Sequence, residues 1–254
     1  MIVDQLISEV RDTAKKRVAV DVRIGLKYTV VLLDDGGCGL AATLSHQLPY
    51  PLEYPGNFRN RSAGELVDLA RSTSILPSSV GVAAINALLK PENIEIVTGD
   101  ITKYLRISKK DTVGMVGAFV PLIPWVQSRA GKLFVFERHP LQGTGEYQPD
   151  WAEPLLLPQC SVVIITAASI ANKTIDSLLG YLKGAHMVAL AGPTTPLSSR
   201  VFKKTRINIL SGIKVINPHK LLEIVSQGGG TRDFGHSVKK VNIVLRPKAG
   251  ELTF

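Results

Sequence analysis

Residues 160–197 constrain the fold of this chain more than any other stretch. Two short apolar runs, 162–165 and 187–191, are each bounded by turn residues, and apolar side chains recur at helical spacing over 175–182 between them. Buried parallel strands joined by a crossover helix have this pattern, so the stretch predicts a βαβ unit. Ligands of open α/β sheets bind just outside the carboxyl ends of the strands, and a functional site is expected there.

The first hundred residues have a different pattern. Apolar residues at 3.6-residue spacing predict an opening helix over 3–14. Three strand-like runs then predict an antiparallel meander, at 18–23, 28–33 and 39–44. Ser62 and Glu65 form a capping-box pattern that predicts one helix, and a second helix is expected over 80–89. Strands followed by helices are typical of an α+β unit.

The second half alternates strands and helices. Beyond the βαβ unit, strands are expected at 113–116, 132–136 and 214–216, with a last antiparallel strand at the sheet edge over 238–245. The overall prediction is an α/β protein, with an α+β domain (1–104) followed by a Rossmann-like domain with a mostly parallel sheet (105–254).

Composition limits the classes of function. No apolar run approaches the roughly 20 residues of a membrane span, and the N-terminus lacks a signal-peptide pattern, so a cytoplasmic protein is expected. The net charge is +9, but Lys and Arg are scattered in twos and threes without interleaved aromatics, which does not favour a nucleic-acid partner. Cys38 and Cys160 are expected to be packed thiols rather than a disulfide.

One glycine motif lies where a dinucleotide-binding turn would lie. The segment Val113-Gly-Met-Val-Gly-Ala-Phe-Val-Pro contains the predicted strand and the turn after it, and Glu137 comes 20 residues after Gly117, as in the Rossmann arrangement of an acidic residue that binds ribose. The three-glycine fingerprint is missing, and Pro121 suits a first helical turn. The motif therefore favours the fold without predicting bound NAD or NADP.

A second motif, Gly192-Pro-Thr-Thr-Pro, follows the second strand of the βαβ unit. Thr195 suits an N-cap and Pro196 a first helical position, so backbone N–H groups would face the crevice. Two interpretations of this motif stay open: a site for an anionic or oxygen-rich ligand, or a capped turn between strand and helix with no ligand. The Asn172-Lys-Thr segment has the same two interpretations, as a cap or as a ligand donor.

The five histidines form no metal-binding spacing, so a metal site would have to be assembled in space. Glu137 and His139 are the nearest local pair of metal ligands, and they follow the same predicted strand.

Several motifs in order resemble one known family over nearly the whole chain. The segments that carry the resemblance include Gly39-Leu-Ala-Ala-Thr, Gly81-Val-Ala-Ala-Ile-Asn-Ala, Val113-Gly-Met-Val-Gly-Ala-Phe-Val-Pro-Leu, Glu137-Arg-His-Pro, Asn172-Lys-Thr and Gly192-Pro-Thr-Thr-Pro. The chain resembles the prokaryotic family of unknown function described as "putative heavy-metal-chelating proteins". The resemblance implies a domain like the N-terminal domain of enolase, a Rossmann-like domain, a site in the cleft between them and a link to metal handling.

Two functions therefore stay open, and the sequence does not decide whether the protein is an enzyme. The first is a binder or chelator of a metal ion or a small metal-containing ligand, at the interdomain cleft. The second is an enzyme that acts on an anionic or nucleotide-like molecule. The oligomeric state is open, a homo-oligomer included. The residues expected at the ligand site are Gly39, Thr43, Asn86, Gly117, Phe119, Glu137, Thr166, Asn172, Gly192, Pro193, Thr194 and Thr195, with Glu137 and His139 as metal ligands.

Overall fold

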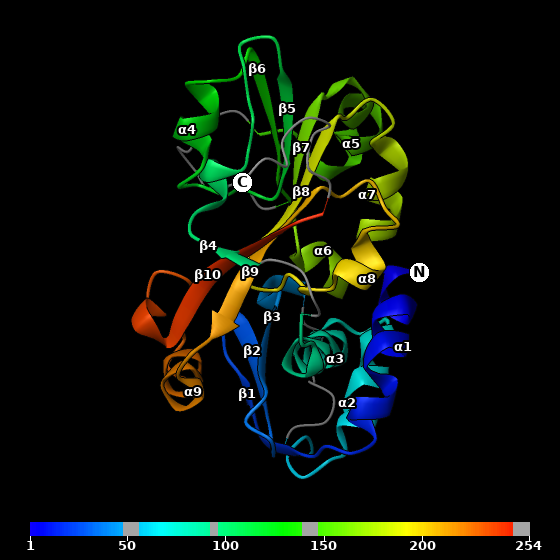
Figure 1. Cartoon of the computed structure of the whole chain (residues 1–254), viewed down its shortest axis with the longest axis vertical. Coiled ribbons are helices and arrows are strands. Elements are labelled where there is room, and N and C mark those ends of the chain that lie inside the picture. The colour runs from blue at the N-terminus through cyan, green and yellow to red at the C-terminus, as the bar shows by residue number, and fades with distance from the viewer. Residues whose placement is uncertain (48–55, 92–95, 139–146, 246–254) are drawn as a thin grey trace.

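The computed structural model describes residues 1–47, 56–91, 96–138 and 147–245. It contains a three-stranded sheet of order β1-β2-β3 and a seven-stranded sheet of order β4-β10-β9-β8-β7-β5-β6. Figure 1 shows the three-stranded sheet with its helices at one end of the molecule and the seven-stranded sheet extending from there to the other end. The α+β pattern followed by a mostly parallel sheet is confirmed.

The N-terminal region is built from three antiparallel strands and three helices. Their bounds are α1 (Ile2–Ala14), β1 (Ala19–Ile24), β2 (Tyr28–Leu33), β3 (Cys38–Ala42), α2 (Ala63–Asp68) and α3 (Ile75–Leu88). The spaced apolar residues of α1 are buried, and β2 pairs antiparallel with both β1 and β3, as predicted. The Ser62 hydroxyl accepts a hydrogen bond from the Glu65 N–H at 3.2 Å, so α2 begins where the capping box predicts. Part of the predicted loop over 47–61 lies outside the described residues.

Helix α3 begins five residues earlier than predicted. Pro77 lies inside its first turn instead of before it, and nearly every side chain of the helix is buried. The helix is buried on all sides because it packs against β2, β3 and α2 and also contacts α6 (Ala168–Ala171) of the second region. Because this helix has no amphipathic period, the residue pattern predicts its start only weakly.

The strands of the seven-stranded sheet run from β4 to β10. Their bounds are β4 (Ile96–Thr98), β5 (Thr112–Val116), β6 (Lys132–Phe136), β7 (Val162–Thr166), β8 (Met187–Ala191), β9 (Ile209–Val215) and β10 (Val238–Val244). Strands β5 to β9 are parallel to one another, and β10 is antiparallel to both β9 and β4. The predicted βαβ unit is confirmed as β7, α6, α7 (Ile175–Tyr181) and β8.

Two strand predictions need correction. The strand expected over 214–216 begins at Ile209, and the last strand is not at the edge, because β4 pairs outside it. A three-residue strand in a charged segment has too few residues to show a period. Strand β4 precedes the expected domain boundary near 105, and that boundary stays a prediction.

The remaining helices are short. They are α4 (Ile123–Gln127), α5 (Glu153–Leu156), α8 (Ser199–Phe202) and α9 (Pro218–Ser226), with 3₁₀ turns at Ser45–Gln47, Leu69–Arg71, Ile101–Lys103, Asp150–Ala152, Leu157–Gln159 and Gly235–Ser237. No helix in the described ranges has the length and apolar character needed to cross a bilayer.

The two regions pack directly against each other. One cluster of buried apolar side chains includes residues of α1 and α3 together with residues of β7 and β8. Helix α9 packs on the other face of the three-stranded sheet, where its Leu221 and Val225 join Val30 and Leu40. The Ser78 hydroxyl of α3 also donates a hydrogen bond to the Ala171 carbonyl oxygen at 2.6 Å. Figure 1 shows β9 and α9 alongside β1 and β2.

Candidate functional site

A cavity of about 690 Å³ lies at the carboxyl ends of the parallel strands. Its lining includes Gly117 after β5, Thr166 at the end of β7 and Gly192 after β8, together with Tyr28 and Ala42 of the three-stranded sheet. In chain order the five parallel strands lie as 2-1-3-4-5, so the direction of the connections reverses between β5 and β7. Ligands of doubly wound sheets bind at such a switch point, which is where this cavity opens.

Eight of the twelve residues predicted for the ligand site line this cavity. They are Gly117, Phe119, Glu137, Thr166, Asn172, Gly192, Pro193 and Thr194. Four segments, at or just after the ends of β5, β6, β7 and β8, thus meet around one volume.

The other four predicted residues lie behind the cavity wall. Gly39 faces α3, and a Cβ atom there would lie 2.1 Å from the Ala83 carbonyl oxygen, so this glycine permits close packing. Thr43 is buried, with its hydroxyl oxygen 3.1 Å from that of Thr29. These two positions serve the packing of β3.

Asn86 and Thr195 hold the Gly192–Thr195 segment in place. The Asn86 amide donates to the carbonyl oxygens of Leu40 at 2.8 Å and Thr194 at 2.9 Å. The Thr195 hydroxyl is shared between the carbonyl oxygens of Gly192 at 2.7 Å and Ser211 at 2.9 Å. The prediction that Thr195 caps the following helix is wrong.

The N-cap of α8 is Ser198, whose hydroxyl accepts from the Val201 N–H at 3.1 Å. Pro196 therefore lies before the helix and not in its first turn. The sequence pattern offered two hydroxyl residues, and only the path of the chain after β8 decides which one caps.

Glu137 fixes the loop that follows β5. Gly117 has φ of +85°, and its N–H donates to the Phe136 carbonyl oxygen at 2.9 Å. The next N–H, that of Ala118, donates to Glu137 Oε2 at 3.0 Å. A Cβ atom at position 117 would lie 2.9 Å from the Thr166 side chain, so glycine serves both the backbone turn and the contact between strand ends. Glu137 thus shapes the cavity wall that it also lines.

Two further contacts shape the wall. Thr194 Oγ1 accepts a hydrogen bond from the Ala42 N–H at 2.9 Å, which ties the Gly192 loop to β3. The Asn172 side-chain oxygen accepts from the Thr174 N–H at 3.2 Å and from its hydroxyl at 2.8 Å, so Asn172 stabilises the turn before α7. Thr194 and Asn172 therefore have structural partners as well as a place in the cavity wall.

Apart from Glu137, the charged residues of the cavity were not predicted from the sequence. Lys240 Nζ lies 2.9 Å from Asp100 Oδ2, Arg138 Nε lies 2.5 Å from Asp150 Oδ2, and Arg232 lines the mouth. Asp150 sits beyond β6, whose Phe136 forms a parallel bridge with Gln148. Asp150 comes two residues after Gln148, so this bridge brings it to the carboxyl end of β6. Patterns of apolar residues do not reveal a single bridge, so the sequence did not predict the position of Asp150.

Burial alters the acidity of two side chains in the cavity wall. Burial raises the pKa of Glu153 to about 7, with a further increase from the Asp150 carboxylate and an opposing effect of Arg138. Burial also raises the pKa of Tyr28 to about 12, so its hydroxyl keeps its proton at neutral pH. The Tyr28 ring packs edge to face against Phe234, with 5.3 Å between ring centres. The cavity therefore combines an apolar body with a carboxyl group that changes charge near neutral pH.

The described side chains do not fit a bare soft metal ion. No group of three or more His, Cys, Asp or Glu residues in the described ranges is arranged to hold a metal ion. Burial raises the pKa of the Cys160 thiol to about 11 and that of Cys38 to about 12, so neither presents a thiolate, the ligand preferred by soft metals. Both cysteines are free thiols, as predicted. His139, the predicted partner of Glu137, lies outside the described residues.

Comparison with known proteins supports the fold over almost the whole chain. A crystal structure of a protein of unknown function from Pyrococcus horikoshii superposes with a TM-score of 0.83 at 26% identity, covering 96% of this chain and 100% of that one. A second, from Desulfitobacterium hafniense, has a TM-score of 0.77 at 24% identity and covers 94% and 98%. Both are described as members of the DUF364 family.

Sequence comparison gives the same result. An uncharacterized protein of Methanocaldococcus jannaschii is 28% identical over 247 residues, 92% of each chain. Residues 7–89 match a family described as "Putative heavy-metal chelation" (DUF4213), and residues 100–244 match a second family with the same description (DUF364). Because the second match covers more than half of the chain, the protein belongs to the DUF364 family, whose description is "Putative heavy-metal chelation".

Proposed function

We propose that this protein binds a metal ion together with a small organic chelator, in the cavity at the carboxyl ends of β5 to β8. The observation that carries the proposal is that the size of the cavity suits a small organic molecule. A volume of about 690 Å³ is in the range of sites for organic ligands and far exceeds the coordination shell of one ion. The family description supports a metal, and the missing three-residue metal cluster among described residues favours a metal that arrives with its own ligands.

The lining supports a bound molecule with an apolar body and a cationic end. Phe119, Phe136 and Val116 supply apolar surface. Beyond β6, Glu137, Asp150 and Glu153 bring carboxyl groups to one end of the same cavity. Carboxylates attract a cation and can complete the coordination of a hard metal whose other ligands are oxygen atoms of a chelator.

Direct metal binding gives the first test. Purified protein is titrated with Fe(III)–citrate, Co(II)–EDTA and the aquo ions, and bound metal is counted by elemental analysis alongside native mass spectrometry. We expect at least one complex to bind one to one and more tightly than the aquo ion. If an aquo ion binds as tightly as every complex, the proposal is wrong.

The Glu137→Gln variant gives the second test, because it keeps an oxygen acceptor for the Ala118 N–H and removes the charge. We expect metal-complex affinity to fall about tenfold, or 1.4 kcal/mol. Glu223→Gln is the matched control, since Glu223 is an exposed residue of α9 that pairs with Lys220. Equal binding by the Glu137→Gln variant and the wild type would remove Glu137 from the site.

A second candidate function is an enzyme that acts on an anionic or nucleotide-like molecule. Glu153 favours it, because a carboxyl group with a pKa of about 7 in a cavity can exchange a proton at neutral pH. Turnover of a bound organic molecule, lost in Glu153→Gln with binding retained, would decide for this function over plain binding.

A further inference from the structure

A second hollow of about 500 Å³ adjoins the cavity at the side of the three-stranded sheet. Tyr28, Ala42, Leu44 and Arg232 line both volumes, so the two communicate. We call this hollow the side pocket. Its own wall adds Lys27, from the turn between β1 and β2.

Two cations of the side pocket lack partners among the described residues. Lys27 and Arg232 are exposed, and neither side chain has a hydrogen bond or ion pair with another described residue. The stem of Lys27 lies against Gly230 in the loop that follows α9, which brings the turn after β1 next to the loop that carries Arg232. Asp233 also lines the pocket, but its carboxylate accepts the Gly230 N–H at 2.7 Å and thereby stabilises its own turn.

The cations of the main cavity differ in this respect. Lys240 is paired with Asp100, and Arg138 is paired with Asp150. The main cavity therefore presents the carboxyl groups of Glu137 and Glu153 while these two cations are paired, and the side pocket has two cations available to a ligand. Such a division of charge fits a molecule with a cation at one end and an anion at the other.

We propose that the side pocket is an oxyanion subsite, in which Lys27 and Arg232 bind a carboxylate or phosphate group of the ligand. The proposal rests on the proposed function, because the group it binds belongs to the chelator whose metal faces Glu137. Arginine binds both kinds of group through paired N–H donors, and lysine adds a point charge. The subsite thus assigns the chelator to the class of polyanions.

The test uses metal-free probes, so that it does not depend on metal binding. Citrate and pyrophosphate are titrated separately into the wild type and into the Lys27→Gln/Arg232→Gln double variant by calorimetry, at two salt concentrations. We expect the wild type to bind at least one probe, more weakly at the higher salt concentration. We expect the double variant to bind that probe at least about tenfold more weakly, as lost charged hydrogen bonds imply.

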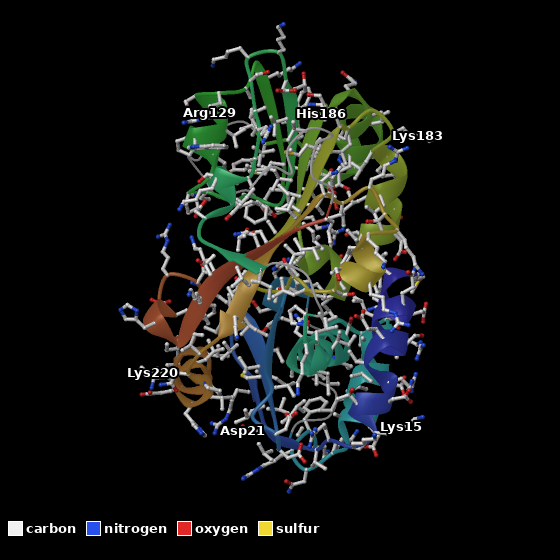
Figure 2. The ribbon with its side chains drawn as sticks, viewed as in Figure 1. Lys15, Asp21, Arg129, Lys183, His186 and Lys220 are labelled. Atoms are coloured by element: carbon white, nitrogen blue, oxygen red, sulfur yellow. The ribbon has the colours of Figure 1, made fainter. Side chains whose placement is uncertain are left out.

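A control variant removes the same charge elsewhere. Lys15 directly follows α1 and Lys183 follows α7. Both are exposed, and Figure 2 shows both on the outer surface of the molecule. The Lys15→Gln/Lys183→Gln variant should bind like the wild type, while circular dichroism confirms that both double variants fold. Binding of citrate alone identifies a carboxylate subsite, and binding of pyrophosphate alone a phosphate subsite.

Two results would overturn the subsite. One is no binding of either probe, and the other is an equal loss of binding in the control variant. Since neither probe contains a metal, a positive result stands even if no metal complex binds. Conversely, if the Lys27→Gln/Arg232→Gln variant binds both probes like the wild type, the subsite is wrong. The proposed function is still supported if metal-complex binding depends on Glu137.

Discussion

The two ends of the parallel strands carry polar residues with opposite roles. At the amino-terminal end, Asp111 accepts hydrogen bonds at 2.8 Å from the Ser108 N–H, the Ser108 hydroxyl and the Ser161 hydroxyl, and His186 Nε2 lies 3.1 Å from its carboxylate. Figure 2 shows His186 at the end of the molecule away from the three-stranded sheet. At the carboxyl end, Glu137 and Glu153 border a cavity of about 690 Å³.

The amino-terminal cluster contains Ser, His and Asp, but none of its members lines either of the two cavities described above. Burial raises the pKa of Asp111, but hydrogen bonds from Ser108, Ser161 and His186 outweigh burial and hold that pKa well below its usual range. Ser108, Ser161 and His186 each contact the Asp111 carboxylate, so these polar groups already have partners within the protein. The comparison teaches that a site needs room and available groups as well as reactive residue types.

The first prediction would break the amino-terminal cluster. Asp111→Ala removes the acceptor shared by three loop residues, Ser108, Ser161 and His186, so the free energy of unfolding should fall by about 3 kcal/mol. Urea denaturation of wild type and variant measures the change. Asp12→Ala is the control, since that exposed carboxylate lies 3.5 Å from Lys15 Nζ in an exposed ion pair whose loss should change little. A stable Asp111→Ala variant that no longer binds the metal complex would reverse the assignment of the two ends.

The second prediction concerns the wall of the cavity. Thr195→Ala leaves the Gly192 and Ser211 carbonyl oxygens without the hydroxyl donor and should cost about 1.5 kcal/mol. Thr195→Ser keeps the hydroxyl and should recover most of this loss in the same denaturation experiment. If Thr195→Ser is as unstable as Thr195→Ala, the methyl group and not the hydroxyl is responsible.

The third prediction concerns the opposite pKa shifts of Asp111, which is lowered, and Glu153, which is raised. Because burial raises the pKa of Glu153 from 4.5 to about 7, the folded state keeps a proton that the unfolded state has lost. Stability of the wild type should therefore fall, relative to Glu153→Gln, as pH rises from 4.5 to about 7. Partial solvent exposure reduces the expected effect to about 1 kcal/mol.

Thermal denaturation across this pH range measures the effect. The hydrogen bond with Lys220 lowers the pKa of Glu223 below its usual value of 4.5, so its effect on stability lies at and below that pH. Glu223→Gln should therefore give a curve parallel to that of the wild type from pH 4.5 to about 7. A wild-type curve parallel to that of Glu153→Gln would show that Glu153 titrates normally.

Local patterns predicted most of the fold. The strands β6 and β8 begin and end where the apolar runs predict, because a buried parallel strand is apolar throughout and polar turn residues bound it. The start of α3 and the strand β4 were missed, because an all-apolar helix and a three-residue strand have no usable period.

Part of the candidate site was also predicted, because local patterns show where each strand ends. Gly117, Thr166 and Gly192 directly follow or end predicted strands, so their place at one end of the sheet follows from the parallel order. Gly39 and Asn86 were placed among ligand residues, but the structure gives both packing or hydrogen-bonding roles inside the protein. Whether any of these residues contacts a ligand stays a prediction.

The sequence by itself determined the βαβ unit and the end of the sheet at which its loops lie, since side-chain period and turn residues are local properties. Only the tertiary structure decided that Tyr28 and Ala42 close the cavity from the other side and that Lys27 comes beside the loop of Arg232. These pairs lie far apart in the chain, and their approach depends on how two sheets pack. Packing of that kind is set by the sum of buried contacts, which no local pattern records.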